Sequence, residues 1–404
     1  MATTANVEVV VVGASLAGLR VAESLRRAGY TDRIVLVGEE EHVPYDRPPL
    51  SKDLLTGRQG PDDIRLRDET GLRELEVDLR LGAAAVGLDS VARTVELRDG
   101  SLIRGDVVII ATGSRARRLP SLGNASGVHV LRTVDDAVAL REAMRRATSM
   151  VVVGAGFIGA EVASAARECG LQVTVVETSV APLCRALGPR LGARLGRLHA
   201  ESGSRLLCET SVVSMDNERV VERVTLHDGS MIETDIVVVG VGTQPNTEWL
   251  AGSGLDTSDG VLCDDRGRAV GAEHVYAVGD VARWTSRRFR DAVRTEHWAA
   301  AGEQAQAVVA DILGLPQPDE AVPYVWSDQF GHRIQIAGRC GEDNAIEVVR
   351  DDGGGFVAIT GRDGRLVSVV AMDDQRRFGV FRRMIGRDAS WGDALLEAKT
   401  KESR

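Results

Sequence analysis

Two short glycine-rich segments carry the clearest chemistry in this sequence of 404 residues. The first reads Gly13-Ala-Ser-Leu-Ala-Gly18 and the second Gly154-Ala-Gly-Phe-Ile-Gly159. Small residues at these spacings let the backbone approach a pyrophosphate, whose negative charge faces the N-terminus of the following helix. The segments therefore predict two dinucleotide-binding loops, formed by Gly13, Ser15, Ala17 and Gly18 and by Gly154, Gly156, Phe157, Ile158 and Gly159.

An acidic residue follows each loop, at the end of the next apolar strand. Glu39 and Glu177 can accept hydrogen bonds there from a ribose diol. A carboxylate at Glu177 would also repel the additional phosphate of NADP, because two like charges about 4 Å apart cost roughly 4 kcal/mol at an effective dielectric near 20. Since about 1.4 kcal/mol is a factor of ten, the second loop is predicted to prefer NAD(H).

Two further residues are assigned to the NAD site. Arg185 could meet the phosphate of NADP, but a pyrophosphate oxygen or plain solvent is an equally good partner. Gly242 lies in the segment Gly240-Val-Gly-Thr-Gln-Pro-Asn246, which follows an apolar strand.

The first loop is predicted to hold FAD. Its small middle residue is Ser15, and much later an apolar strand ends in Gly279-Asp280, where the Asp280 carboxylate can accept hydrogen bonds from the ribityl chain. A further apolar strand ends in Ala111-Thr112-Gly113. These three residues and Val86 are assigned to the FAD site with Asp280.

The elements that must position these loops form a repeated pattern. Strand Val7–Val12, helix Leu19–Ala28 and strand Ile34–Val37 surround the first loop, and strand Val151–Val153, helix Ala160–Cys169 and strand Val173–Val176 surround the second. Each unit continues into short strands with turn signals, including Asp99-Gly100 and Asp228-Gly229, and then an apolar strand ending in glycine. Beyond Pro323 the residue pattern becomes typical of β-strands, which predicts a third, smaller domain.

Composition excludes several classes of function. The formal net charge of -10 argues against general nucleic-acid binding. No apolar run reaches the roughly 18 residues needed to span a bilayer, so no membrane association is expected and a cytoplasmic location is predicted. The five cysteines have neither disulfide-relay nor zinc-like spacing, so no metal site is expected. Of 49 cationic residues only Lys52, Lys399 and Lys401 are lysines.

The sequence resembles the FAD- and NAD(P)-dependent pyridine-nucleotide oxidoreductase superfamily over nearly its whole length. It is most similar to the subgroup of flavoprotein reductases that pass electrons to ferredoxins, as in aromatic dioxygenase systems. The segments Pro44-Tyr-Asp-Arg-Pro-Pro-Leu-Ser-Lys52 and Val325-Trp-Ser-Asp-Gln329 carry this narrower likeness. Disulfide reductases of the superfamily have a CxxxxC pair on the helix after the first acidic strand, and this sequence has Arg47-Pro-Pro-Leu-Ser-Lys there.

The resemblance implies an α/β fold with two Rossmann-like dinucleotide-binding domains and a C-terminal α+β interface domain, as in glutathione reductase. The FAD-binding domain is expected over residues 1–115 and 246–323, the NAD-binding domain over 116–245, and the interface domain over 324–404.

The resemblance also implies roles for individual residues. Lys52 is expected beside flavin N5, paired with Glu161, and these two are the implied catalytic residues. Arg47 and Arg132 match FAD-contacting positions. Trp298 is implied near the stack of isoalloxazine and nicotinamide, although core packing is an alternative.

With no disulfide relay, the electron acceptor must approach the flavin edge itself. The expected partner is a small [2Fe–2S] ferredoxin that feeds an oxygenase. Two arginine clusters could attract it electrostatically, unless they are simply solvated. We call them the first arginine cluster (Arg287, Arg288, Arg290 and Arg294) and the second arginine cluster (Arg376, Arg377, Arg382, Arg383 and Arg387).

Alternatives to a ferredoxin reductase remain open. A rubredoxin reductase would carry the same loops, and a monodehydroascorbate-type reductase or an oxidase is a weaker fit. A different class is an NADH-sensing flavoprotein similar to apoptosis-inducing factor, whose redox state would control partner binding.

Overall fold

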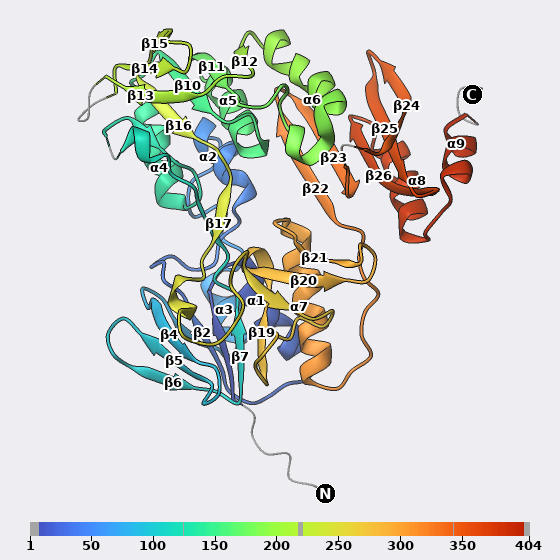
Figure 1. Cartoon of the computed structure of the whole chain (residues 1–404). Coiled ribbons are helices and arrows are strands. Elements are labelled where there is room, and N and C mark those ends of the chain that lie inside the picture. The colour runs from blue at the N-terminus through green and yellow to red at the C-terminus, as the bar shows by residue number, and fades with distance from the viewer. Residues whose placement is uncertain (1–7, 124, 217–220, 342, 400–404) are drawn as a thin grey trace, which may run out of the picture. The chain divides into compact units, whose positions relative to one another are not determined.

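The computed structural model describes residues 8–123, 125–216, 221–341 and 343–399 (Figure 1). Contacts within the chain define two compact units, which we describe separately. The first unit comprises Met1–Asp46, Ile64–Arg115 and Gln244–Pro323, and the second comprises Arg47–Asp63, Ala116–Thr243 and Tyr324–Arg404. The short segment Arg47–Asp63 thus belongs to the second unit although its sequence neighbours belong to the first. The expected three-domain division stays a prediction.

The first unit is built on a parallel sheet whose central strands contain only Val, Ile and Leu. Strand β1 (Val9–Val12) lies between β2 (Ile34–Val37) and β7 (Val107–Ile110), and all three are fully buried. The order is β19-β7-β1-β2-β3, with β3 at Asp78–Arg80 and β19 at Val275–Ala277. Continuous apolar strands are expected where helices or further layers cover both faces of a parallel sheet.

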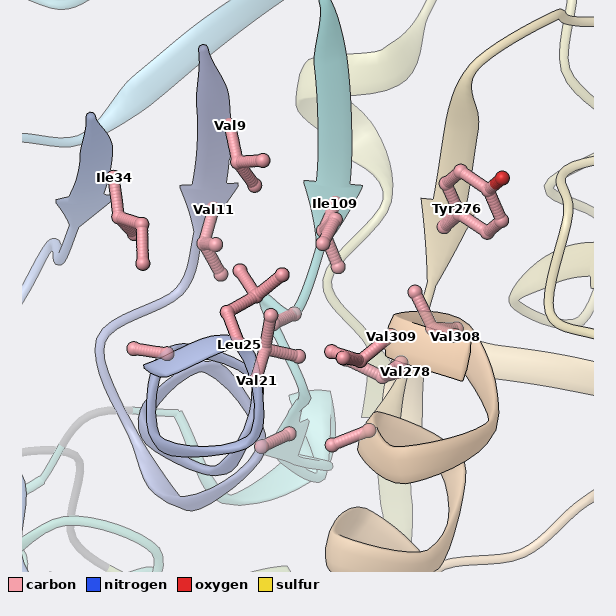
Figure 2. Packing of buried hydrophobic residues seen from close by; sticks show 14 of the residues in the cluster. Val9, Val11, Val21, Leu25, Ile34, Ile109, Tyr276, Val278, Val308 and Val309 are labelled. Carbon is pink, nitrogen blue, oxygen red and sulfur yellow. The ribbon is translucent and has the colours of Figure 1, made fainter. Parts of the chain in front are cut away.

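Helices α1 (Leu16–Arg27) and α7 (Trp298–Ile312) cover one face of this sheet. Figure 2 shows Val21 and Leu25 of α1 and Val308 of α7 below the strands that carry Val9 and Ile109. Because side chains alternate along a strand, Val10 and Val12 point to the other face.

That second face is covered by short elements of the same unit. They include an antiparallel sheet of β4 (Ala85–Asp89), β5 (Thr94–Leu97) and β6 (Leu102–Arg104), and a sheet of β18 (Val261–Cys263), β20 (Ala282–Ser286) and β21 (Asp291–Arg294). The unit also contains α3 (Glu69–Glu74) and the 3-10 turns η3 (Glu248–Leu250) and η4 (Gly279–Val281).

The second unit repeats the plan. Its parallel sheet has the order β12-β11-β10-β16-β9, with β9 at Val128–His129, β10 at Ser149–Val153, β11 at Gln172–Val176, β12 at Arg205–Leu207 and β16 at Ile236–Val239. An antiparallel sheet again precedes the last apolar strand, formed by β13 (Val212–Met215), β14 (Arg223–Leu226) and β15 (Met231–Glu233). The turn expected at Asp228-Gly229 joins β14 to β15, which pair antiparallel.

The second unit contains the helix expected after its glycine loop and further helices that were not predicted from the sequence. They are α4 (Val134–Met144), α5 (Phe157–Glu168) and α6 (Cys184–Glu201), and a capping box between Thr133 and Asp136 begins α4. The segment Arg47–Asp63 adds the 3-10 turn η1 (Pro48–Ser51) and the short helix α2 (Asp53–Thr56). A further turn η2 spans Pro120–Leu122, and strands β8 (Ser114–Ala116) and β17 (Thr243–Pro245) lie where the chain passes from one unit to the other.

The C-terminal part is an antiparallel sheet followed by two helices. The strand order is β22-β23-β26-β25-β24, with β22 at Tyr324–Gln329, β23 at His332–Gly338, β24 at Ala345–Asp352, β25 at Gly355–Arg362 and β26 at Arg365–Met372. Helices α8 (Gln375–Gly386) and α9 (Trp391–Lys399) complete it. Leu187 and Leu191 of α6 join one buried cluster with Ile334 and Phe356 of this sheet, which places it in the second unit. The predicted fold class is confirmed.

The helices that follow the glycine loops begin earlier than the sequence predicts. Both α1 and α5 include the last glycine of their loop in the first turn, rather than starting after it. The reason is the tight packing of that glycine against the loop, described below. Among the described residues, no helix combines the length and hydropathy needed to cross a membrane.

Candidate functional site

The first glycine loop is held so tightly that two of its positions require glycine. Gly13 has a φ of +122°, and a Cβ atom there would lie 2.1 Å from the carbonyl oxygen of Ala111. A Cβ on Gly18 would lie 2.0 Å from the carbonyl oxygen of Gly13. These contacts bring β1, α1 and the end of β7 together at the carboxyl edge of the sheet, where ligands bind in open α/β sheets.

The second loop has the same construction. Gly154 has a φ of +100° and its Cβ would lie 2.4 Å from the carbonyl oxygen of Gly240, while a Cβ on Gly159 would lie 2.0 Å from that of Gly154. Gly156 differs, because its φ is -76° and no described atom lies within 4 Å of a Cβ built on it. The fold therefore does not require glycine at 156, and the open space beside it suits a bound pyrophosphate.

The two helices that follow the loops also suit anions. Gly156 is the N-cap of α5 and has no side chain, and within the described residues Ser15 provides no side-chain cap for α1. The amides of the first turns can therefore donate to phosphate oxygens, and the helix dipole favours negative charge there. The residues present fit two dinucleotides.

The acidic residues predicted to bind ribose differ in their surroundings. Glu39 follows β2 and forms an ion pair with Arg98 at 3.1 Å, in which both side chains are 70% exposed. Such an exposed pair contributes only about 0–1 kcal/mol, so a ribose can displace it. Glu177 is half-buried and its carboxylate accepts hydrogen bonds from the amides of Ala155 and Ser179, both at 2.8 Å. The loop thereby fixes the orientation of Glu177.

Arg185 and Gly242 lie close together in the second unit. The Arg185 guanidinium lies 3.5 Å from the position that a Cβ on Gly242 would take, and Gly242 has a φ of +100°. Arg185 is exposed at the start of α6, so its side chain can follow a ligand at the carboxyl edge of the second sheet.

The residues at the ends of β7 and β19 form a network in the first unit. Thr112 donates to the carbonyl oxygen of Asn246 at 2.8 Å, and the Asn246 side-chain amide donates to the carbonyl oxygen of Thr112 at 2.9 Å. Ser114 donates to the Asp280 carboxylate at 3.0 Å, and Gln304 accepts from the amide of Gly279 at 2.7 Å. Asp280 is thereby held beside the predicted FAD loop.

Trp298 is the first residue of α7 and is 38% exposed, so it is not a core residue. Its indole nitrogen donates to the Asp46 carboxylate at 2.7 Å, and the Arg20 guanidinium lies 5.8 Å from the centre of its ring. Val86 on β4 is also exposed, at 43%.

Lys52 and Glu161 form a buried ion pair in the second unit. The ammonium nitrogen of Lys52 lies 2.7 Å from Oε2 of Glu161, with the side chains 17% and 4% exposed. Lys52 also donates to the carbonyl oxygen of Pro48 at 3.1 Å. The proline-rich turn η1 sets the position of Lys52, and α5 directs Glu161 toward it immediately after the second loop.

Arg47 and Arg132, the other two predicted FAD contacts of this unit, are also brought together. A guanidinium nitrogen of Arg47 donates to the carbonyl oxygen of Arg132 at 2.6 Å. The Asp136 carboxylate accepts from the amides of Arg132 and Thr133, at 3.0 and 2.9 Å. The backbone around Arg132 is therefore fixed by the cap of α4.

The two arginine clusters differ in how far their charges are neutralised. In the first, Arg294 pairs with Asp259 and Glu296, and Arg287 pairs with Asp265. The guanidinium of Arg288 donates to the backbone carbonyl of Glu320, whose carboxylate accepts from the backbone amide of Arg288. In the second, Arg377 pairs with Asp374 and Arg382 lies 4.7 Å from the Tyr324 ring centre. Arg376, Arg383 and Arg387 are exposed and have no ion pair within the described part of the chain. The spacing of Arg376 and Arg383 places them on one face of α8, and Arg387 is the residue that caps the C-terminus of this helix.

None of the five cysteines, all of which are described, forms a disulfide. Burial raises the pKa of the Cys263 thiol to about 12, and burial also raises the pKa of Cys169, Cys208 and Cys340. These four thiols are therefore protonated near neutral pH and are poor nucleophiles.

Comparison with known families agrees with this construction. Residues 7–305 match the model of the pyridine nucleotide-disulphide oxidoreductase family, and residues 324–402 match the reductase C-terminal family. The chain belongs to the pyridine nucleotide-disulphide oxidoreductase family. Members of this family use a nicotinamide cofactor with a flavin, which fits the two glycine loops.

Similar proteins within the family include components of dioxygenase systems. The ferredoxin reductase component of chlorobenzene dioxygenase from Cupriavidus sp. (strain PS12) is 39% identical over 96% of this chain and 94% of that protein. The ferredoxin–NAD(+) reductase subunit of the benzene 1,2-dioxygenase system from Pseudomonas putida is 38% identical over 93% and 92%. Among solved structures, the covalent complex of putidaredoxin reductase with putidaredoxin aligns with a TM-score of 0.91 and 30% identity, over 95% of this chain and 94% of that chain.

Several residues at these sites were not predicted from the sequence. Ser51 and Ser327 both donate to Glu161, and Asn246 fixes the turn after β7. Ser51 and Ser327 lie inside the two segments that carried the resemblance, and that position was the only signal for them. Their common partner is evident only from the fold.

Proposed function

We propose that this chain is an NADH-dependent ferredoxin reductase. In this proposal FAD is bound through the first loop and NAD(H) through the second, and electrons pass singly to a small [2Fe–2S] protein that feeds an oxygenase. The observation that carries the proposal is the buried Lys52–Glu161 pair, in the segment where disulfide reductases have their cysteine pair. With a fixed cation there and no disulfide, electrons must leave from the flavin itself.

The two loops are assigned to different cofactors because the residues around them differ. The first loop adjoins Asp280 and Thr112, whose polar side chains suit the hydroxyls of a ribityl chain and flavin-side groups. The second loop adjoins Glu177, which suits a ribose diol, and Glu161, which follows the loop on α5. Arg47, Lys52 and Arg132 complete the proposed FAD contacts.

The proposed reaction needs binding and charge control more than acid–base catalysis. The flavin, when bound, supplies hydride acceptance from NADH and delivery of single electrons. Glu161 and the carbonyl oxygen of Pro48 hold Lys52, so that its ammonium provides a positive charge at a fixed place. Such preorganised charge stabilises negative charge that develops in the reaction without further reorganisation. Glu177 selects NADH, because the loop amides of Ala155 and Ser179 hold its carboxylate in place.

The second arginine cluster is the better docking surface of the two. Two arginines of the first cluster are neutralised in ion pairs, Arg287 by Asp265 and Arg294 by Asp259 and Glu296. Within the described residues, Arg376 and Arg383 on α8 and Arg387 at its C-terminal cap present unpaired charge, on a chain whose net charge is -10. A local positive surface of this kind attracts an acidic ferredoxin electrostatically, even though the chain as a whole is negatively charged.

The similar proteins support this function, because the dioxygenase components named above are themselves ferredoxin reductases. A cytoplasmic location is part of the proposal, since cysteines that form no disulfide are typical of a reducing compartment.

The test is anaerobic reduction of the purified yellow protein by NADH, followed by mixing with one acceptor. A [2Fe–2S] ferredoxin and a rubredoxin are compared at equal concentration. Faster reoxidation by the ferredoxin supports the proposal, and faster reoxidation by the rubredoxin selects the alternative acceptor. Failure of NADH to bleach the flavin contradicts both. Identification of the released flavin by chromatography tests the FAD assignment separately.

A further inference from the structure

Glu161 is a buried carboxylate whose two oxygens are both held by donors. Oε2 lies 2.7 Å from Nζ of Lys52 and also accepts from the hydroxyl of Ser51. Oε1 accepts from the hydroxyl of Ser327 at 2.6 Å. Glu161 is only 4% exposed, so donors from the protein must satisfy its two oxygens in place of water.

Ser327 comes from β22 in the C-terminal sheet, far along the chain from Glu161. It is 0% exposed, and its oxygen accepts from the side-chain amide of Gln329 at 2.9 Å. A serine hydroxyl has one proton, and an ionised carboxylate can only accept. The proton of Ser327 must therefore point to Glu161, and Gln329 must be the donor that fixes the rotation of the hydroxyl.

The strand that carries Ser327 is attached to α5 at a second point. The amide of Phe330, just after β22, donates to the hydroxyl of Ser164 on α5 at 2.7 Å. Ser164 lies three residues beyond Glu161, so both bonds join the same stretch of helix to the same strand. The distance between Ser327 and the Glu161 carboxylate is thereby set by backbone as well as by side chains.

We infer that Ser327, fixed by Gln329, is a positioning residue for the Lys52–Glu161 pair. The hydrogen bond from Ser327 stops the Glu161 carboxylate from rotating about its own axis, and thus keeps Oε2 directed at Lys52. The C-terminal sheet in this way supplies part of the proposed catalytic machinery. As far as it concerns the rate of hydride transfer, the inference rests on the proposed function.

Ser368 offers a matched control. Like Ser327 it is 0% exposed and lies in the C-terminal sheet, on β26, and its hydroxyl is hydrogen-bonded to Thr360 and Cys340, at 2.6 and 2.9 Å. Ser368→Ala therefore removes a buried hydroxyl from the same sheet without touching Glu161. A loss that comes only from a weakened sheet should be similar in Ser327→Ala and Ser368→Ala.

The experiment combines two double-mutant cycles. In the first, the rate of flavin reduction by NADH is measured by stopped flow for Ser327→Ala, Lys52→Met and both together. We expect Ser327→Ala to lower the rate roughly tenfold in the wild-type chain and to have no further effect when Lys52 is already Met, because groups that act as a unit are not additive. Ser368→Ala should leave the rate within about twofold of wild type.

The second cycle needs no activity and uses urea unfolding midpoints for Ser327→Ala, Glu161→Ala and the pair. Loss of Ser327 should lower the midpoint less in the Glu161→Ala background than in the wild-type chain, whereas Ser368→Ala should lower it equally in both. Additive effects of Ser327→Ala in both cycles would overturn the inference. If NADH fails to reduce even the wild-type flavin, the proposed function fails, and the unfolding cycle still decides the hydrogen bond. If Glu161→Ala does not fold, the kinetic cycle decides alone.

Discussion

The ammonium of Lys52 lies 2.7 Å from the carboxylate of Glu161, and this contact joins the proline-rich turn to the helix that follows the second dinucleotide loop. Lys52 is the only lysine before the C-terminal tail of an arginine-rich chain. A compact ammonium fits beside a buried carboxylate in a way that the broad, planar guanidinium of arginine does not. The pair therefore connects the sequence pattern to the proposed chemistry.

Breaking this pair should be costly to stability. Glu161→Gln leaves the largely buried Lys52 charge without its partner, which we expect to lower the free energy of unfolding by about 3 kcal/mol. Glu142→Gln is the control, because its pair with Arg145 is exposed, at 47% and 72%, and should contribute less than about 0.5 kcal/mol. Urea unfolding measures both. Equal small losses would show that Lys52 and Glu161 are not coupled in the folded protein.

Two glycines of the second loop should respond differently to alanine. Gly159→Ala places a Cβ 2.0 Å from the carbonyl oxygen of Gly154, so the variant should fold poorly. Gly156→Ala meets no described atom within 4 Å, and an N-cap change from glycine to alanine should cost no more than about 1 kcal/mol. We therefore expect Gly156→Ala to keep its stability but bind NADH at least roughly tenfold more weakly, because the methyl group occupies the space for the pyrophosphate. Thermal unfolding and NADH titration separate these effects. Undiminished NADH affinity in Gly156→Ala would contradict the placement of NAD(H) at this loop.

Glu177 should determine the choice of nicotinamide cofactor. Glu177→Gln keeps the size and shape of the side chain and removes the charge that repels the phosphate of NADP, although its single carbonyl oxygen can accept from only one of the two loop amides. The ratio of kcat/KM for NADH to that for NADPH should fall by about tenfold or more. Arg185→Gln in the same background shows whether Arg185 then binds the phosphate, in which case NADPH use falls again. An unchanged ratio in Glu177→Gln would mean that another residue sets the preference.

Charge reversal should distinguish the two arginine clusters. Arg383→Glu with Arg387→Glu removes unpaired positive charge from α8, so ferredoxin-dependent turnover should fall at low salt and lose most of its salt dependence. Arg290→Glu in the first cluster is the comparison, since Arg290 is exposed while its neighbours Arg287 and Arg294 are paired with Asp265 and Asp259. Cytochrome c reduction across a salt series measures both. A larger effect from Arg290→Glu would move the docking surface to the first cluster.

His199 should make the protein less stable in mild acid. It is 1% exposed and packs edge-on against Phe330, and burial lowers the pKa of its imidazole from an ordinary 6.5 to about 4. As the pH falls from about 6.5 to about 4, the imidazole is protonated in the unfolded chain but not in the folded chain. This difference lowers the free energy of unfolding by on the order of 3 kcal/mol across that pH range.

Comparing His199→Leu with the wild type isolates this effect. The variant should lose less stability than the wild type between pH 7 and pH 4.5 in urea unfolding. His227→Leu, at an exposed position, should follow the wild-type curve. Parallel curves for His199→Leu and the wild type would show that the imidazole can be protonated without unfolding.

Much of the fold could be predicted because each central strand is apolar and ends in a glycine loop or turn. The strands Ile34–Val37, Val107–Ile110 and Ile236–Val239 were predicted with the bounds that the structure has. The starts of α1 and α5 were predicted too late, because the approach of Gly18 and Gly159 to the loop carbonyls depends on packing and not on helical periodicity.

The site was predictable only in part. The pairing of Lys52 with Glu161 came from the resemblance, and the structure brings the two together. The hydroxyl of Ser327 could not be assigned to Glu161, since a buried serine in a strand has many possible partners until the sheet is placed against α5. The inclusion of Arg47–Asp63 in the second unit likewise follows from three-dimensional contacts, and no sequence pattern predicted it.

The most direct test of the account is whether NADH oxidation depends on the iron–sulfur partner. Purified protein, NADH and cytochrome c are mixed with and without a [2Fe–2S] ferredoxin, and cytochrome c reduction is followed. We predict rapid reduction with ferredoxin, little without it, and a strong preference for NADH over NADPH. A flavin that NADH reduces and that then stays reduced, with no increase in turnover on adding ferredoxin, would contradict it and would favour a sensor of NADH.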